Sequence, residues 1–98
     1  MDYGIHIEDA FDESIKKFTL SERRVIFNKI NLLKNNIDHP SLRTEKLYKG
    51  TNVEIRSSSV SMGIRLIWQL EGNIIHINDV GRHDIYRKYN KGKKGKGQ

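Results

Sequence analysis

The feature that most constrains the fold is a long alternation of apolar and polar residues in the second half of the chain. One two-residue phase is kept for eleven residues by Val60, Met62, Ile64, Leu66, Trp68 and Leu70. This period is typical of a strand with one buried face. The same phase returns at Ile75 and Ile77, after a turn predicted at Glu71-Gly72. The pattern therefore predicts antiparallel strands that share one apolar face.

Two shorter segments also have the period of a strand. Residues 3–7 alternate apolar and polar positions at the start of the chain. Val53 and Ile55 alternate with polar residues, and we expect a connection at residues 57–60 to join them to the long strand. The turn at Glu71-Gly72 sets Arg65 beside Asn78.

Helical spacing separates the first strand from the others. Phe11, Ile15 and Phe18 recur at the spacing of one helix face. Thr19, with Glu22 three residues later, has the form of a capping box that starts a second helix. The apolar stripe predicted for that second helix consists of Ile26, Ile30, Leu33 and Ile37.

The predicted order is strand, helix, helix, strand, strand, strand, which defines an α+β fold. A chain of 98 residues is too short for two cores, so we expect one domain over residues 1–90. Residues 91–98, KGKKGKGQ, lack the apolar side chains that order a segment and are expected to form a flexible basic tail.

Several classes of protein are excluded by composition. The chain has no cysteine, hence no disulfide, thiol nucleophile or cysteine-based zinc site. The N-terminus is acidic where a signal peptide is basic, and no apolar stretch has the length of a membrane span, so we expect a cytoplasmic protein. His6, His39 and His76 have no partners at metal-ligand spacing, and we predict no metal and no cofactor.

The net charge of +6 is unevenly distributed. Residues 87–98 hold six Lys or Arg residues and no acid, and residues 43–65 hold five bases against two acids. Such a surface suits a polyanion, RNA above all, although a basic tail can also serve only for solubility.

Polar residues are expected on the sheet face that the helices leave uncovered. They are Asn52, Glu54, Arg56, Ser61, Arg65, His76 and Asn78. Arg65 stands out because it interrupts an otherwise apolar strand. It could bind an anion, be solvated on an open antiparallel face, or form an ion pair with Glu54.

Three segments, HPSLRTEKLYKG, GIRLIWQLEGNIIHINDVG and NDVGRHDIYRKY, occur in this order along the chain. Together they resemble the RelE/ParE superfamily of small toxins, in particular the RelE, YoeB and YafQ-like mRNA interferases, over roughly residues 3–89. The resemblance implies a RelE-like fold, a twisted antiparallel sheet with two helices on one face, to which a short C-terminal helix can be added. It also implies a type II toxin that cleaves mRNA on the ribosome without metal and is inhibited by an antitoxin protein.

The resemblance also implies roles for individual residues. The family's arginine falls on Arg65, its histidine on His83 and its aromatic on Tyr86, with Tyr89 in reserve because relatives often space the aromatic one residue further. Glu45 matches the base of YoeB-like members, whereas RelE relies on lysines and arginines. The implied RNA-binding residues are Lys46, Lys49, Arg56, Arg82, Arg87 and Lys88.

These residue types suit metal-free cleavage of RNA. The ribose 2′-OH must lose a proton, the charge of the transition state must be neutralised, and the leaving 5′-oxygen must gain a proton. His83 can serve as acid or base, Arg65 can hold a phosphate in two hydrogen bonds, and Tyr86 can stack on a base. Each could instead be structural: His83 on the surface, and the tyrosines as aromatics of a terminal helix.

Three functions therefore compete. The first is a ribosome-dependent endoribonuclease toxin. The second is a gyrase inhibitor of the ParE type, against which His83 and Glu45 argue. The third is an inactive member of the fold that only binds RNA or a partner protein.

Overall fold

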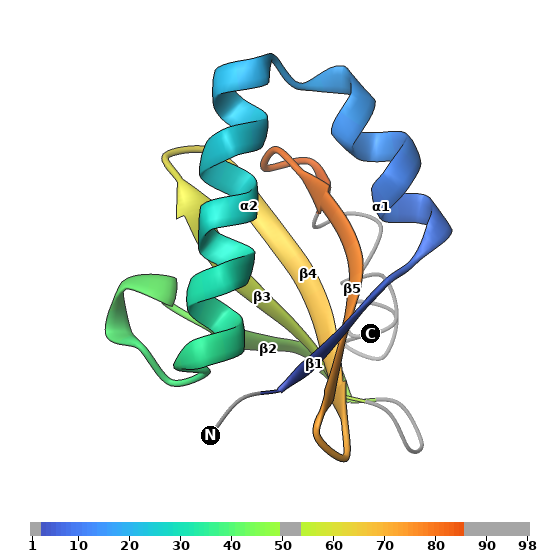
Figure 1. Ribbon diagram of the computed structural model, residues 1–98, viewed down its shortest axis with the longest axis vertical. Coiled ribbons are helices and arrows are strands. Elements are labelled where there is room, and N and C mark those ends of the chain that lie inside the picture. The colour runs from blue at the N-terminus through green and yellow to red at the C-terminus, as the bar shows by residue number, and fades with distance from the viewer. Residues whose placement is uncertain (1–2, 50–53, 86–98) are drawn as a thin grey trace, which may run out of the picture.

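The computed structural model describes residues 3–49 and 54–85, without the side chains of Tyr48 and Lys49. Its elements, shown in Figure 1, are β1 (Gly4–Ile7), α1 (Asp9–Ser14), η1 (Ile15–Lys17), α2 (Leu20–Asn35), η2 (Pro40–Leu42), β2 (Glu45–Lys49), β3 (Glu54–Ser61), β4 (Ile64–Glu71) and β5 (Ile74–Gly81). Within the described ranges, no helix is both long and apolar enough to cross a lipid bilayer. The proposed tail and C-terminal helix lie outside the described residues.

The strands form one sheet in the order β1-β5-β4-β3-β2. Three of the pairings are antiparallel, whereas β1 runs parallel to β5, so the sheet is mixed. Helices α1 and α2 lie on the same side of this sheet (Figure 1). The predicted α+β fold with two helices on one face is confirmed, with one strand more than the pattern indicated.

The second helix begins as its sequence predicts and ends at Asn35, before Ile37, which the predicted stripe included. The backbone N–H of Glu22 donates to Thr19 Oγ1 at 3.1 Å, and the backbone N–H of Thr19 donates to Glu22 Oε1 at 2.9 Å. This capping box satisfies two amide groups that the first turn would otherwise leave unpaired. Ile26, Ile30 and Leu33 of the apolar stripe are buried, so the stripe fixes which side of α2 meets the sheet.

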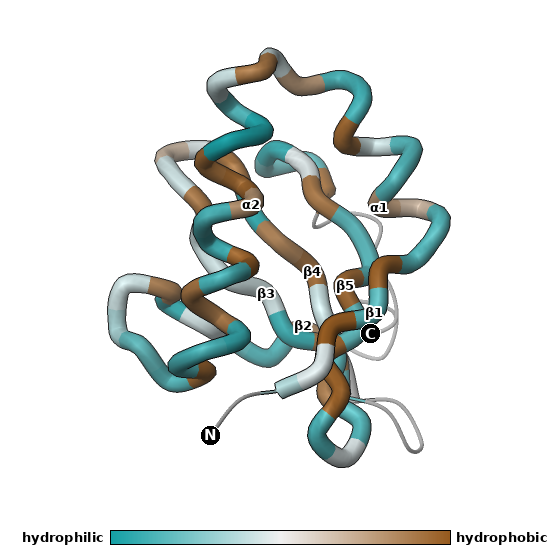
Figure 2. The backbone as a smooth tube through the Cα atoms, in the orientation of Figure 1, coloured by the Kyte–Doolittle hydropathy of each residue, from teal (hydrophilic) through white to brown (hydrophobic). Residues whose placement is uncertain are grey.

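The main core lies between the helices and the sheet. Figure 2 shows hydrophobic positions recurring along α2, β4 and β5, where these elements lie over one another. The core includes Trp68, which is fully buried and whose indole Nε1–H donates to Ser58 Oγ at 2.9 Å. A smaller cluster of Leu47, Ile67 and Ile85 lies apart from this core. In the register of β4, Ile67 alternates with the core residues Leu66 and Trp68, which places the smaller cluster on the opposite face.

The long predicted strand is in fact two strands of a hairpin. The chain turns at Met62 and Gly63, where Gly63 has a φ of +82° that favours glycine, and Met62 is 98% exposed rather than buried. The connection expected at residues 57–60 instead lies inside β3. A two-residue turn keeps the even spacing of apolar residues, so alternation alone cannot distinguish one long strand from a hairpin.

Strand β2 was not predicted, because its residues were interpreted as a basic loop. It pairs antiparallel with β3 at the edge of the sheet. Edge strands commonly carry charged side chains, which prevent pairing with other chains and hide the apolar alternation. In this sequence the charged residues at positions 45, 46 and 49 hide the apolar alternation.

The register of β4 and β5 also differs from the prediction. Their turn lies at Gly72-Asn73, and Asn78 is the extra residue of a bulge between two registers. Trp68 therefore lies opposite Ile77, and Arg65 lies opposite Gly81 rather than Asn78. The later turn shifts the partner of Trp68 by two residues, which leaves side chains on the same face, so the apolar pattern does not separate these two registers. The bulge adds a third residue to the shift at Arg65.

Candidate functional site

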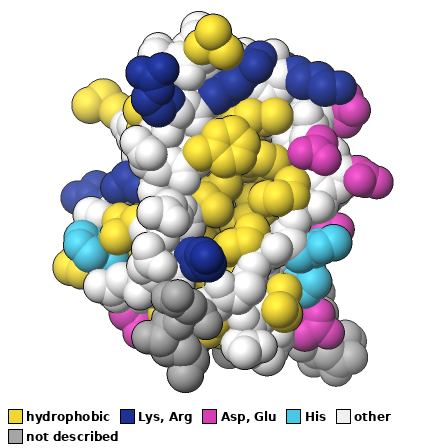
Figure 3. Space-filling model, viewed as in Figure 1, with side chains coloured by type: hydrophobic (Ala, Val, Ile, Leu, Met, Phe, Trp, Pro, Cys, Tyr) yellow, Lys and Arg dark blue, Asp and Glu magenta, His cyan; other side chains and the backbone are white. Residues whose placement is uncertain are grey.

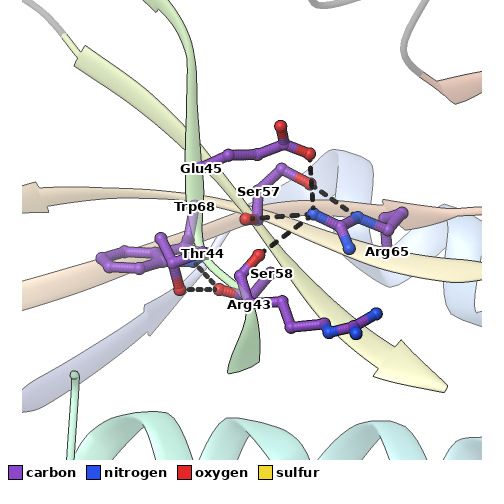
Figure 4. A network of polar contacts seen from close by, with 7 residues as sticks. All are labelled: Arg43, Thr44, Glu45, Ser57, Ser58, Arg65 and Trp68. Carbon is purple, nitrogen blue, oxygen red and sulfur yellow. Dashed lines mark hydrogen bonds and ion pairs between the residues drawn. The ribbon is translucent and has the colours of Figure 1, made fainter. Parts of the chain in front are cut away.

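The site is centred on Arg65, near the start of β4. Its side chain is only 13% exposed. The guanidinium Nε–H donates to Ser57 Oγ at 3.0 Å, and Nη2 donates to Glu45 Oε2 at 3.1 Å (Figure 4). Ser57 and Glu45 lie opposite each other on β3 and β2, so three neighbouring strands supply the three side chains. The predicted arginine and the predicted base are therefore in direct contact.

Backbone carbonyls complete the support of the guanidinium. Nη2 also donates to the carbonyl oxygens of Arg43 and Ser57, both at 3.4 Å. Arg43 has a φ of +45°, the only positive φ among the described non-glycine residues. This left-handed residue follows η2 and leads the chain towards β2. Ser57 is fully buried, so the side of the guanidinium that faces the sheet has a fixed orientation.

Glu45 gives the site an acceptor for protons. Its side chain is 58% exposed, so the ion pair with Arg65 lies at the surface. Partly exposed ion pairs contribute little free energy, because water and salt screen them. An incoming phosphate can therefore exchange with the carboxylate on the guanidinium at a small cost.

His83 follows the end of β5, near the same end of the sheet. Arg65 lies opposite Gly81, two residues before His83, so the corrected register brings the two predicted residues closer than the predicted register did. The segment is anchored by Ile85, which is buried with Leu47 and Ile67. A Cβ at Gly81 would lie 2.8 Å from Ile85 Cδ1, which explains the glycine at that position.

Arg82, predicted to bind RNA, is engaged with the helical layer. Its Nη2 donates to Glu22 Oε2 at 3.0 Å, and its guanidinium lies 4.9 Å from the centre of the Phe18 ring. Hydrogen bonds from the Thr19 backbone N–H and from Arg82 lower the pKa of the Glu22 carboxyl below its ordinary value of 4.5. Arg82 thus ties the segment before His83 to the start of α2.

The sequence indicated that Arg56 and Glu54 lie on the open face, and this prediction is wrong. Arg56 lies opposite Trp68, with its guanidinium carbon 5.2 Å from the centre of the indole ring, which places it on the face of the helices. Glu54 Oε2 lies 3.5 Å from Arg56 Nε and 3.3 Å from Lys46 Nζ. The error follows from the misplaced hairpin, which put Arg56 in the opposite phase. Lys46 pairs with Arg56 in the register and shares its face.

The remaining predicted residues fall outside what the structure describes. These are Tyr86, Tyr89, Arg87 and Lys88, and the side chain of Lys49. Their roles stay predictions.

Sequence reasoning missed Ser57, which accepts the hydrogen bond from Arg65 Nε. The signal was present as three consecutive serines, residues 57–59, between apolar positions. It was interpreted as a connection because serine is common in turns.

The inference that the histidines lack partners at metal-ligand spacing is also wrong for two of them. The parallel pairing of β1 with β5 sets His6 directly opposite His76. His76 Nδ1 and His6 Nε2 lie 3.1 and 3.5 Å from the same oxygen of Glu8. Only the register of two distant segments reveals this cluster.

Comparisons with known proteins identify the fold. No protein-family model matches the chain, and no curated protein does. Among solved structures, RelE of the archaeal RelE-RelB complex from Pyrococcus horikoshii is similar with a TM-score of 0.69 at 13% identity, covering 84% of this chain and 96% of that one. The E. coli DinJ-YafQ complex gives 0.68 at 17% identity, covering 85% and 96%. The YoeB dimer from Staphylococcus aureus gives 0.63 at 19% identity, covering 85% and 99%. The chain therefore has the fold of RelE-like toxins, as its resemblance implied.

Proposed function

We propose that this protein is the toxin of a type II toxin-antitoxin system and an endoribonuclease that cleaves mRNA on the ribosome. The observation that carries the proposal is the Arg65 guanidinium, held by buried Ser57 against the exposed carboxylate of Glu45. It lies near the end of β5 that leads to His83, on a fold shared with RelE, YafQ and YoeB. An activity on translating ribosomes would place the protein in the cytoplasm.

The proposed reaction uses groups of the chain itself. A phosphate of the RNA takes the place of Glu45 on the Arg65 guanidinium, which holds the charge that develops in the transition state. Glu45, or a lysine or arginine in its place, accepts the proton of the 2′-OH as that oxygen attacks the neighbouring phosphate. His83 gives a proton to the leaving 5′-oxygen, and Tyr86 stacks on a base. The products are a 2′,3′-cyclic phosphate and a 5′-hydroxyl end.

Further contacts to RNA are proposed from charge alone. The residues are Lys46, Lys49, Arg56, Arg82, Arg87 and Lys88. Arg56 and Lys46 are bound to Glu54 on the face of the helices, so they would contact a distant part of the RNA or the ribosome rather than the cleaved phosphate.

An antitoxin partner is supported by the helical layer. Leu20, Val25 and Phe27 of α2 are 75%, 39% and 48% exposed, and the Phe27 ring packs edge-on against Phe11 of α1 at 5.9 Å. Figure 3 shows hydrophobic side chains at the surface between the two helices. An apolar surface of this kind suits a protein partner. Two of the similar structures are complexes, RelE with RelB and YafQ with DinJ.

The deciding experiment combines programmed ribosomes with primer extension of their mRNA. We expect cuts that require translation and that disappear in Glu45→Gln/Arg65→Lys protein. Arg24→Lys, which alters an exposed arginine on α2, serves as the control and should cut like the wild type. Inhibited gyrase with intact mRNA would reassign the protein to the ParE type. Binding to ribosomes without either effect would leave an inactive binding module.

A further inference from the structure

The cluster of His6, Glu8 and His76 lies on the open face of the sheet, at its β1 edge. Ile5 and Ile7 of β1 pack against the main core, as do Ile75 and Ile77 of β5, so the histidines between them project from the opposite face. Glu8 follows β1 directly, and its backbone N–H donates to the Ile77 carbonyl at 3.0 Å. The three residues are therefore positioned by backbone pairing.

The spacing of their polar atoms fits a metal ion. One potential ligand atom from each residue lies within 4.8 Å of the other two. The Glu8 oxygen lies 3.1 Å from His76 Nδ1 and 3.5 Å from His6 Nε2. Two atoms bound to a tetrahedral zinc ion at 2.0–2.1 Å lie about 3.3–3.4 Å apart, so two of the three spacings match.

A second carboxylate orients His76. Its Nε2 lies 2.9 Å from Glu71 Oε1, and a carboxylate can only accept, so Nε2 carries the proton. In a neutral imidazole, Nδ1 then presents a lone pair towards an oxygen of Glu8, only 3.1 Å away. Two acceptors at this distance require a cation between them, either a proton on Nδ1 or a metal ion. Hydrogen bonding of a ligand histidine to a carboxylate is the usual outer shell of a zinc site.

We propose that His6, Glu8 and His76 bind a divalent transition-metal ion, with zinc as the best fit, and that Glu71 orients His76 as a positioning residue. Two imidazoles and one carboxylate form a common ligand set for zinc, with a fourth place open to water. The two carboxylates balance the charge of the ion. His6 and Glu8 have exposed side chains, and Glu8 and His76 line a surface pocket, so an ion can enter from solvent.

The ion would join the edge strand β1 to its neighbour β5. It would be separate from the proposed nuclease site, since His76 lies opposite Gln69, four residues along β4 from Arg65 and thus roughly 13 Å away. Its loss should leave RNA cleavage intact. The proposal is thus independent of the proposed function.

The test is zinc titration of the full chain without a histidine tag, by calorimetry and by thermal unfolding. We expect one zinc ion per chain and a rise in Tm that EDTA reverses. Zinc should also slow hydrogen exchange of the backbone amides of β1. His76→Gln and His6→Gln should each weaken binding at least about 10-fold, and Glu71→Gln about 10–100-fold. His39→Gln, outside the cluster, should bind like the wild type.

Circular dichroism establishes that each variant is folded. Because His6 and His76 lie on different strands, a local distortion of one strand cannot explain a loss of zinc binding in both variants. The proposal would be overturned if the wild type did not bind zinc, or if both histidine variants bound zinc as tightly as the wild type. A rise in stability on acidification that depends on His76, without zinc binding, would mean that a proton occupies the place between His76 and Glu8.

Discussion

Two adjacent serines of β3 serve opposite faces of the sheet. Ser58 Oγ accepts the indole N–H of Trp68 on the helical face, whereas Ser57 Oγ accepts the Nε–H of Arg65 on the open face (Figure 4). Both serines are fully buried. Ser58 Oγ also lies 2.6 Å from Thr44 Oγ1, so it has two polar partners, the indole of Trp68 and the hydroxyl of Thr44. Ser57 instead supports a cation whose far side reaches Glu45 at the surface.

This difference separates stability from function within one strand. The helical face buries a large aromatic whose polar atom needs a partner. The open face holds a charged group in one orientation while leaving its partner accessible, which a binding site for phosphate requires. Alternation along the strand decides that Ser58 faces the core and Ser57 faces the open side of the sheet.

The largest effect is expected on the helical face. Trp68→Ala removes a fully buried indole and should lower the free energy of unfolding by about 3–5 kcal/mol, enough to unfold a small domain. Urea denaturation followed by circular dichroism measures it. Trp68→Phe keeps most of the apolar volume but leaves Ser58 without the indole donor, so it should lower the free energy of unfolding less than Trp68→Ala does. A stable Trp68→Ala protein would show that the core lies elsewhere.

On the open face, Arg65→Lys should reduce activity far more than stability. Lysine keeps the charge but cannot bridge Ser57 and Glu45 through a planar fork, so cleavage should fall about 10²–10³-fold. The free energy of unfolding should change by less than about 2 kcal/mol. Single-turnover cleavage on ribosomes and urea denaturation test both parts.

The matched control is Arg24→Lys, because Arg24 is exposed on α2. It should change neither cleavage nor stability. Full activity of the Arg65→Lys protein would remove the arginine from the reaction.

The two serines themselves give the sharpest contrast. Ser58→Ala leaves a buried indole N–H without its acceptor and should cost about 1–3 kcal/mol of stability. Ser57→Ala removes one of several partners of Arg65. Compared with Ser58→Ala, it should lower the free energy of unfolding less and reduce the rate of cleavage more. Measuring both quantities for both variants gives a crossed pattern. Parallel losses would mean that the two faces are not functionally distinct.

The smallest effect concerns the hydrogen bond from Arg82 to Glu22, which joins the segment after β5 to the start of α2. The pKa of Glu22 is lowered by Thr19 and Arg82, so its contribution to stability is complete above the unfolded value of 4.5 and is lost as pH falls through the lower folded value. Between about pH 7 and about pH 3, wild-type Tm should therefore fall more than that of Glu22→Gln. Equal slopes would show that the carboxylate contributes nothing.

Local patterns were sufficient for the helical layer and for the identity of the buried face. The capping box at Thr19 and the stripe from Ile26 depend on residues three or four apart, so neighbours in the chain determine them. The placement of Arg65 on the open face also followed from alternation in its own strand. The glutamate in contact with it, Glu45, was indicated by the family resemblance.

Tertiary structure decided the rest, because a two-residue period fixes the face of a side chain but not its register. The hairpin at Met62-Gly63 preserves the apolar phase, yet it moved Arg56 to the other face. The register of β4 and β5, with its bulge at Asn78, brought Arg65 near His83. The pairing of β1 with β5 joins segments about seventy residues apart, and only that contact places His6 beside His76. The sequence by itself thus determined the layers and the buried face of β4, whereas the hairpin and the cross-strand pairing determined the face of Arg56 and which polar side chains meet.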